Sequence, residues 1–231
     1  MGPTYVLACR TPWALAAFAN RRERLPGRWH ILTAKADLSR ESLAALRPRY
    51  VFFPHWSWIV PAPVIEEYEC VCFHMTDVPY GRGGSPLQNL IARGRRDTVL
   101  TALRMDESTD TGPVYFKVPL SLEGDAEAIY RRAAELSLDL MERIIAEEPE
   151  PTPQVGDPVL FTRRRPEESR LPTDGDAERL YDHIRMLDAA GYPHAFTDLD
   201  DWRLTFTDAS HQDDQVSARV RFTRRDDEGT R

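Results

Sequence analysis

Short apolar runs alternate with amphipathic helical segments through the first half of the chain. Residues 5–9, 29–33, 50–53 and 69–74 are apolar runs of strand length. Helical spacing follows Pro12, Ser39 is a suitable N-cap for a second helix, and residues 62–68 predict a short third one. Strands that alternate with helices indicate an α/β fold, with a parallel sheet and right-handed crossovers.

The pattern changes in the second half. Residues 86–93 predict a helix closed by Gly94, and residues 97–105 and 114–120 predict two more strands. Asp125 caps a long helix at 126–148, whose apolar positions recur every three or four residues and form a core-facing stripe. The Pro-rich segment 149–158 reads as a linker. Beyond it, a helix at 176–189 and short strands at 159–163, 195–199, 202–207 and 216–222 predict a small mixed unit with a disordered charged tail, 224–231.

Composition restricts the function classes. Of the 231 residues, 42% are hydrophobic and 29% are charged, as in ordinary globular proteins. The net charge of −7 argues against broad nucleic-acid binding, although a local basic patch stays open. Three cysteines and the absence of a basic, apolar leader predict reduced thiols and a cytoplasmic location. The apolar runs are too short to span a bilayer, so we expect no membrane association.

Two polar segments, 72–86 and 105–114, each follow a predicted strand, where ligands bind in parallel sheets. The imidazole of His74 can accept a proton from an amine. Asp110 can orient that ring or take the proton itself. A loop with Gly81, Gly83 and Gly84 lets a ligand approach the backbone. On these residues alone, a structural histidine and an ordinary Asp-Thr-Gly turn stay open as alternatives.

The order and spacing of these residues resemble the folate-dependent formyltransferase family, which includes methionyl-tRNA and sugar-nucleotide formyltransferases. That family has Asn-x-His, a turn before Pro, Arg-Gly-x-x-Pro, and then Asp-Thr-Gly about 36 residues after the histidine. This chain has His74, a turn ending at Pro79, the stretch 82–86 (RGGSP), and Asp110-Thr111-Gly112, 36 positions after His74. The resemblance covers residues 50–145 best. Residues 184–185 and 193–196 also resemble the small C-terminal unit of the sugar enzymes.

The resemblance implies a Rossmann-like formyltransferase domain with a mostly parallel sheet at 1–150, and a small C-terminal α+β subdomain at 151–231. It implies 10-formyltetrahydrofolate as the formyl donor, with His74 and Asp110 as catalytic residues. His74 would hold or protonate the oxyanion, or steer the amine, and Asp110 would orient His74 and help to take up the amine's proton. The folate would contact an apolar loop, the glycine-rich loop and the segment before Asp110, that is, Trp58, Ile59, Val60, Arg82, Gly83, Gly84, Arg104, Asp106, Glu107 and Thr109.

One position departs from the family pattern. Cys72 stands where the family has the asparagine whose amide is thought to steady the oxyanion. A thiol is a weak hydrogen-bond donor, and loss of one oxyanion donor typically lowers turnover by about 100- to 1000-fold. Gln88, Asn89 and the backbone amides of Gly83 and Gly84 are the candidates for a replacement donor.

Other interpretations are weaker. Cys70, Cys72 and His74 alternate along one strand, but such spacing does not easily surround a tetrahedral ion, so no metal site is predicted. A nucleophilic Cys72 would need a lowered pKa, and direct attack by an amine requires no covalent intermediate. His55 and His194 are expected to have a structural or surface role, and the basic run 163–165 is as well explained by solvation as by anion binding.

The sequence therefore predicts an N-formyltransferase. The expected acceptor is the primary amine of a small molecule, first an amino-sugar nucleotide, then an amino acid or a secondary-metabolite amine, and transfer RNA is not expected. The alternative is a non-catalytic homologue that binds folate or a nucleotide as an accessory protein. The oligomeric state, including a homodimer, stays open.

Overall fold

A computed structural model describes residues 2–225, so the end of the predicted disordered tail, residues 226–231, lies outside the described residues. The chain forms two compact units. The first contains residues up to 83, 98–120 and 130–161, and the second contains 84–97, 121–129 and the chain from 162 onward. The division into functional domains at 150 stays a prediction.

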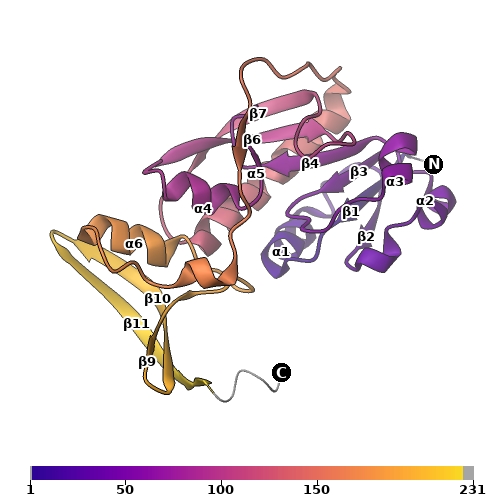
Figure 1. Cartoon of the computed structure of the whole chain (residues 1–231). Helices are drawn as coiled ribbons and strands as arrows, with labels where there is room; N and C mark the ends of the chain where they lie inside the picture. Colours follow the sequence, from indigo (N-terminus) through magenta and orange to yellow (C-terminus); the bar gives the residue numbers. More distant parts are fainter. Residues whose placement is uncertain (1, 226–231) are drawn as a thin grey trace. The chain divides into compact units, whose positions relative to one another are not determined.

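The first unit is built on a six-stranded sheet in the order β2-β1-β3-β4-β6-β7 (Figure 1). The four strands β2, β1, β3 and β4 are parallel, and β6 runs antiparallel to β4. The strands are β1 (Thr4–Ala8), β2 (Arg28–Leu32), β3 (Tyr50–Phe53), β4 (Cys70–His74), β6 (Asp97–Arg104) and β7 (Val114–Ser121). The predicted, mostly parallel sheet is therefore confirmed.

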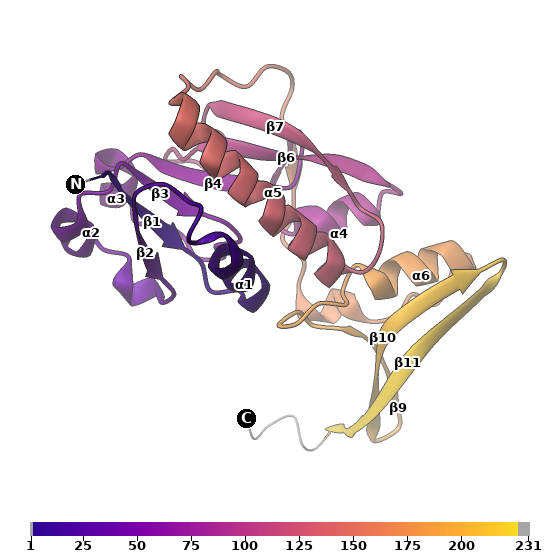
Figure 2. The same cartoon turned by 180° about the vertical axis from the view of Figure 1, so that it is seen from behind.

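Helices cover both faces of this sheet. On one face, alternate strand residues such as Val6, Val51 and Cys70 pack with α2 (Arg40–Leu46) and α3 (Ala62–Glu67) in one buried cluster. On the other face, Trp29 contacts Phe18 of α1 (Pro12–Arg21). The long helix α5 (Ala126–Glu147) lies on the same side as α1 (Figure 2). Both faces of the central strands β1 and β3 are thus buried.

Local sequence signals account for several helix boundaries. The Ser39 hydroxyl accepts a hydrogen bond from the Ser42 amide and caps α2, as predicted. The Asp125 carboxylate accepts from the Ala128 amide at 2.7 Å and caps α5. At the end of α1, Arg21 forms ion pairs with Glu135 and Asp139 of α5. The caps determine where α2 and α5 begin, and the ion pairs join α1 to α5.

The segment after α5 returns along the first unit. Thr152 pairs with Val114 of β7 through two backbone hydrogen bonds of 2.7 and 2.8 Å. The short strand β8 (Val159–Phe161) then pairs in parallel with β5 (Tyr80–Gly83). The sequence predicted a linker over 149–158, but backbone pairing ties this segment down at Thr152. The strand β5 was missed because two of its four residues are glycine.

The second unit contains an antiparallel sheet in the order β11-β10-β9, packed against α6 (Ala177–Arg185). Its strands are β9 (Ala195–Leu199), β10 (Trp202–Gln212) and β11 (Gln215–Arg224), the last two longer than predicted. The second unit also contains α4 (Pro86–Ile91) and the 3-10 turn η2 (Pro166–Ser169). Another 3-10 turn, η1 (Lys35–Asp37), lies in the first unit. Among residues 2–225, no helix has the length and apolar character needed to span a bilayer.

Candidate active site

His74 is the last residue of β4 and is buried. Its ring atom Nε2 lies 2.8 Å from the carbonyl oxygen of Gly81. A carbonyl oxygen only accepts hydrogen bonds, so Nε2 carries the proton of the neutral ring. Thr76 donates to the same carbonyl at 3.2 Å. The other ring atom, Nδ1, is therefore the nitrogen that is able to accept a proton.

Asp110 lies beside this open nitrogen. Its Oδ2 atom is 3.5 Å from His74 Nδ1 and accepts a hydrogen bond from the Gly83 amide at 3.0 Å. The two side chains are 8% and 13% exposed, so water screens the pair weakly. A distance of 3.5 Å is too long for a direct hydrogen bond, but a proton on Nδ1 would face a carboxylate. The structure thus brings together the two residues that the sequence placed 36 positions apart.

Two glycines shape the loops around the pair. Gly81 has a φ of 77°, and a Cβ there would come within 2.7 Å of the Thr76 side chain. At Gly112, a Cβ would lie 1.8 Å from the carbonyl oxygen of Arg104. No side chain fits at that distance, so the Asp-Thr-Gly turn can pack against the end of β6 only with glycine at its third position.

Cys72 lies two residues before His74 on β4 and packs against the cluster formed with α2 and α3. Burial raises the pKa of its thiol well above the usual 9.0, and the negative charge of Asp110 raises it further. The thiol is therefore neutral at physiological pH, and a neutral thiol is a poor nucleophile. This environment argues against a covalent role for Cys72.

Three of the four candidate replacement donors have hydrogen-bond partners. The Gln88 side-chain amide donates to the carbonyl of Met186 at 3.0 Å, and the Asn89 amide donates to the carbonyls of Gly84 and Ser85. The Gly83 amide donates to Asp110. None of these three groups is therefore assigned as a substitute for the family's asparagine.

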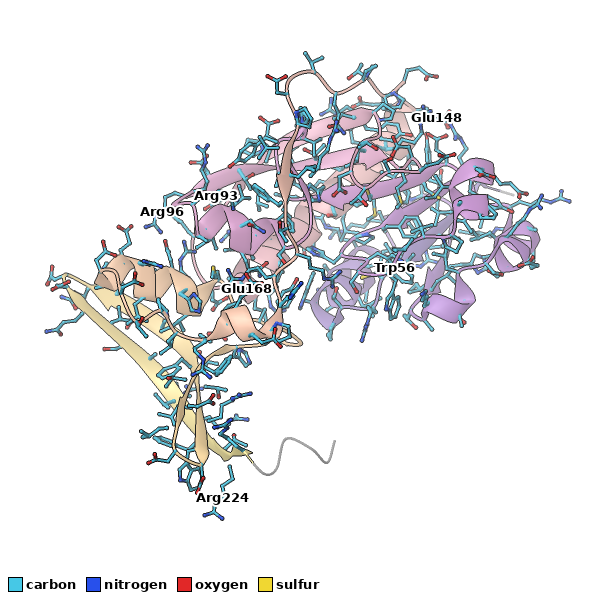
Figure 3. All side chains as sticks on the ribbon, in the orientation of Figure 1. Trp56, Arg93, Arg96, Glu148, Glu168 and Arg224 are labelled. Carbon is cyan, nitrogen blue, oxygen red and sulfur yellow. The ribbon has the colours of Figure 1, made fainter. Side chains whose placement is uncertain are left out.

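The predicted apolar loop follows β3, where Trp56 is labelled in Figure 3. Ile59 is 86% exposed, whereas Val60 is buried. The Trp58 ring contacts Trp56, with ring centroids 4.9 Å apart, and the guanidinium of Arg10 lies 4.8 Å from the Trp58 ring centroid. Among the residues described, the buried indole Nε1 of Trp56 has no hydrogen-bond partner. The loop therefore offers one exposed apolar side chain and one unused donor.

The segment before Asp110 is a polar turn. Asp106 Oδ1 accepts from the Ser108 amide at 3.1 Å and from the Thr111 hydroxyl at 2.5 Å. The side chain of Arg104 is half-exposed and lies 3.9 Å from Glu69. Glu107 and Thr109 are exposed. Asp106 thus folds the turn, and the roles of these four residues in ligand binding stay predictions.

The residues of the glycine-rich loop have different partners. The guanidinium of Arg82 is bound to the side chain of Gln154, and the Gly83 amide is bound to Asp110. Gly84 belongs to the second unit. The sequence did not single out Gln154, although it is the one polar side chain between Thr152 and Asp157.

A second histidine lies at the end of β3. His55 has a φ of 54° and contacts the rings of Trp13 and Tyr130 edge-on. Burial lowers its pKa from 6.5 to about 3, so it is neutral. Within residues 2–225, no group of three or more His, Cys, Asp or Glu side chains is arranged to hold a metal ion.

Comparison with known proteins gives this site its context. A family model described as the C-terminal domain of methionyl-tRNA formyltransferase matches residues 166–223. A methionyl-tRNA formyltransferase from Gluconobacter oxydans is 31% identical over 83% of this chain and 63% of its own length. One from Campylobacter curvus is 28% identical over 67% of this chain and 53% of its own length. The chain thus spans about half to two thirds of these curated relatives.

Solved structures extend the comparison over nearly the whole chain. A structure titled methionyl-tRNA formyltransferase from Clostridium thermocellum is 39% identical, covers 96% of this chain and 99% of its own, and has a TM-score of 0.93. HypX from Aquifex aeolicus in complex with tetrahydrofolic acid shares the fold, with a TM-score of 0.74 at 18% identity over 90% of this chain and 38% of its own. Both the α/β architecture and the resemblance drawn from residues 74–112 are confirmed. The chain belongs to the folate-dependent formyltransferase family.

Proposed function

We propose that the protein transfers a formyl group from 10-formyltetrahydrofolate to a primary amine. The observation that carries this proposal is the buried pair of His74 and Asp110, with Nδ1 and Oδ2 3.5 Å apart, in a chain of the formyltransferase family. The pair offers a proton acceptor beside a carboxylate that compensates the charge it gains.

The residues present suit a folate donor. A pterin is flat, with an apolar face and a hydrogen-bonding edge, and the loop after β3 supplies the exposed Ile59 and the unpartnered indole of Trp56. The polar turn 106–109, which follows the end of the β6 pairing, supplies backbone groups outside the sheet. When bound, the folate supplies an activated formyl carbon. These residues would hold the pterin and leave the chemistry to the pair.

His74 acts as the proton acceptor in this proposal. As the amine attacks, it loses a proton to Nδ1, because Nε2 is already protonated toward the Gly81 carbonyl. The resulting imidazolium donates through Nε2 to Gly81 and faces Asp110 through Nδ1. The Nε2–H group donates to Gly81, and the carboxylate offsets the positive charge in a poorly solvated site. As the bond between the formyl carbon and the donor's nitrogen breaks, His74 returns the proton to that leaving nitrogen, so the products are the N-formyl amine and tetrahydrofolate and the ring is neutral again.

The presence of Cys72 in place of the family's asparagine determines the turnover that we expect. A neutral thiol donates only weakly to the negative charge that develops on the formyl oxygen. We therefore expect turnover roughly 100- to 1000-fold below that of an otherwise equal site with asparagine. Cys72→Asn should raise the rate constant kcat, while Cys72→Ala, the matched control, should not.

We propose a small-molecule amine as the acceptor, with an amino-sugar nucleotide first and an amino acid or secondary-metabolite amine next. The 37 acidic and 30 basic residues leave no cationic excess for the phosphates of a nucleic acid. Methionyl-tRNA is the second candidate, favoured by the 39% identity to the Clostridium thermocellum methionyl-tRNA formyltransferase.

The experiment incubates the purified protein with 10-formyltetrahydrofolate and three acceptor groups: amino-sugar nucleotides, free amino acids and methionyl-tRNA. Mass spectrometry then searches for a product heavier by one formyl group. Product with a small amine supports the proposal, and product with methionyl-tRNA alone replaces the acceptor class. Absence of folate binding would refute the proposed function.

A non-catalytic accessory role is the alternative, and the loss of the family's asparagine favours it. The variant Cys72→Asn discriminates between the two. If the wild type has negligible formyl-transfer activity and Cys72→Asn has much more, the native site serves mainly for binding. Substantial native activity with little gain would show that another group supplies the donor.

A further inference from the structure

The side-chain amide of Gln154 uses all of its hydrogen-bonding capacity. Its Nε2 atom donates to the carbonyl of Asp110 at 2.9 Å and to the carbonyl of Gly112 at 2.8 Å. Its Oε1 atom accepts from Nε and Nη2 of Arg82 at 3.1 and 2.8 Å. Only an NH2 group faces two carbonyls favourably and only an oxygen faces a guanidinium, so these partners fix the amide orientation.

The two carbonyls that Gln154 binds belong to Asp110 itself and to Gly112, the first and third residues of the turn that carries the carboxylate of the pair. Asp110 has a φ of 57°, a left-handed conformation that is unfavourable for most residues and tolerated by aspartate. The turn is further held by the Arg104 amide, which donates to the carbonyl of Pro113 at 2.9 Å. Gln154 thus supplies two of the hydrogen bonds that keep Asp110 in this conformation.

Gln154 is itself held from both sides. Two residues before it, Thr152 pairs with β7, and five residues after it, the Val159 amide donates to the carbonyl of Pro79 at 3.1 Å. Arg82 belongs to β5 and pairs in register with Leu160 of β8. The amide therefore joins the segment after α5 to both loops of the candidate site.

We infer that Gln154, oriented by Arg82, is a positioning residue that holds Asp110 beside His74. The inference rests on the proposed function only for its effect on turnover. Asp110 Oδ2 contacts both His74 and the Gly83 amide, so a rotation of the turn would break both contacts together. Gln154 alone, within the segment that the sequence predicted as a linker, is then the residue that supports the position of Asp110.

Two substitutions test this role. Gln154→Glu keeps an oxygen for Arg82 but replaces the two N–H donors with an oxygen that faces two carbonyls. Gln154→Leu removes every hydrogen bond at similar volume. Val155→Ala is the matched control, because Val155 is the next residue and is 89% exposed.

Three measurements are made on the full chain: steady-state kinetics, amide hydrogen exchange at Gly83 and in residues 108–114, and the ¹⁵N spectrum of the His74 ring. For Gln154→Glu and Gln154→Leu, we expect kcat to fall by about 10- to 100-fold, with the KM for the folate donor within about twofold, as for a lost orienting contact. Exchange at Gly83 should accelerate and the Nδ1 signal should move. Val155→Ala should match the wild type in all three.

Each result has a distinct meaning. Unchanged Gly83 exchange and an unchanged Nδ1 signal would overturn the inference, as would faster exchange with kcat intact, since Gln154 would then serve stability alone. If the wild type transfers no formyl group, the proposed function fails, and the exchange and ¹⁵N data still decide whether Gln154 positions Asp110. Global unfolding of Gln154→Leu would leave Gln154→Glu to decide.

Discussion

The carbonyl of Gly81 determines which ring nitrogen of His74 carries the proton. Gly81 accepts from Nε2 at 2.8 Å, whereas Asp110 stands 3.5 Å from Nδ1. The sequence predicted that Asp110 would orient the ring, but the short contact belongs to Gly81. Asp110 is then placed to stabilise the charge that the ring gains after accepting a proton.

The cysteine thiols should react slowly in the folded protein. Burial raises the pKa of Cys72 well above 9.0, that of Cys70 to about 12, and that of Cys9 as well. Iodoacetamide at pH 8 should therefore label all three at least about tenfold more slowly than in the urea-unfolded chain, because the thiolate is the reacting form. Peptide mass spectrometry gives each rate. Rapid labelling of Cys72, which is partly exposed, would contradict the raised pKa of its thiol.

Gly112→Ala should damage both stability and turnover. The new Cβ would lie 1.8 Å from the Arg104 carbonyl, so the turn that carries Asp110 must move. We expect a loss of about 1–3 kcal/mol in the free energy of unfolding, as for an overpacked site, measured by urea denaturation. The control Gly94→Ala meets nothing within 4 Å, although its φ of 70° costs about 1 kcal/mol. Equal activity in the two variants would count against the close approach.

At the scale of elements, α1, α5 and the end of β3 meet at a buried aromatic group. Trp13 of α1 stacks on Tyr130 of α5, with ring centroids 5.3 Å apart, and His55 contacts both rings edge-on. The pKa of His55 is lowered to about 3, so the folded state does not bind the proton that the unfolded chain binds below about pH 6.5. Burial of the ring therefore links this packing to pH.

The stability from His55 is fully present above pH 6.5 and falls as the pH drops from 6.5 toward 3. The slope is at most about 1.4 kcal/mol per pH unit, since only the unfolded state takes up the proton. His55→Asn should flatten the decline in unfolding free energy between pH 6.5 and 4, measured by urea titrations at each pH. Identical slopes in the variant and the wild type would show that His55 is solvated.

The elements that the sequence predicted best are those fixed by burial. The boundaries of β3 match the prediction, because Tyr50 to Phe53 are all buried and apolar. The strand β5 (YGRG) was not predicted, because its pairing with β8 depends on tertiary contact rather than on its own residue pattern. The strands β10 and β11 were predicted too short, because their far ends are polar and gain order by pairing with each other.

The sequence likewise predicted only part of the candidate site. The residues His74 and Asp110 were predictable from strand ends and motif spacing, and the structure brings them together. The contact of Nε2 with Gly81 and the amide of Gln154 were not predictable, because both depend on loop conformations that leave no periodic pattern.

At the scale of the whole molecule, the site belongs to one of the two compact units. Residues 74, 81, 83, 110 and 154 all lie in the first unit, although 80 positions separate the first from the last. The second unit contains the residues 166–223 that match the C-terminal family model. The chemistry of the proposed reaction is thus carried by the first unit's own contacts.

The most direct test of the central claim is formyl transfer by the wild type, His74→Gln, Asp110→Asn and the exposed control Asp97→Asn, with folding of each variant verified by circular dichroism. We predict folate-dependent formylation of an amine by the wild type and the control. Loss of the proton acceptor or of its carboxylate should lower kcat by about 100-fold or more. Equal rates in all four proteins would contradict the assignment of the reaction to His74 and Asp110.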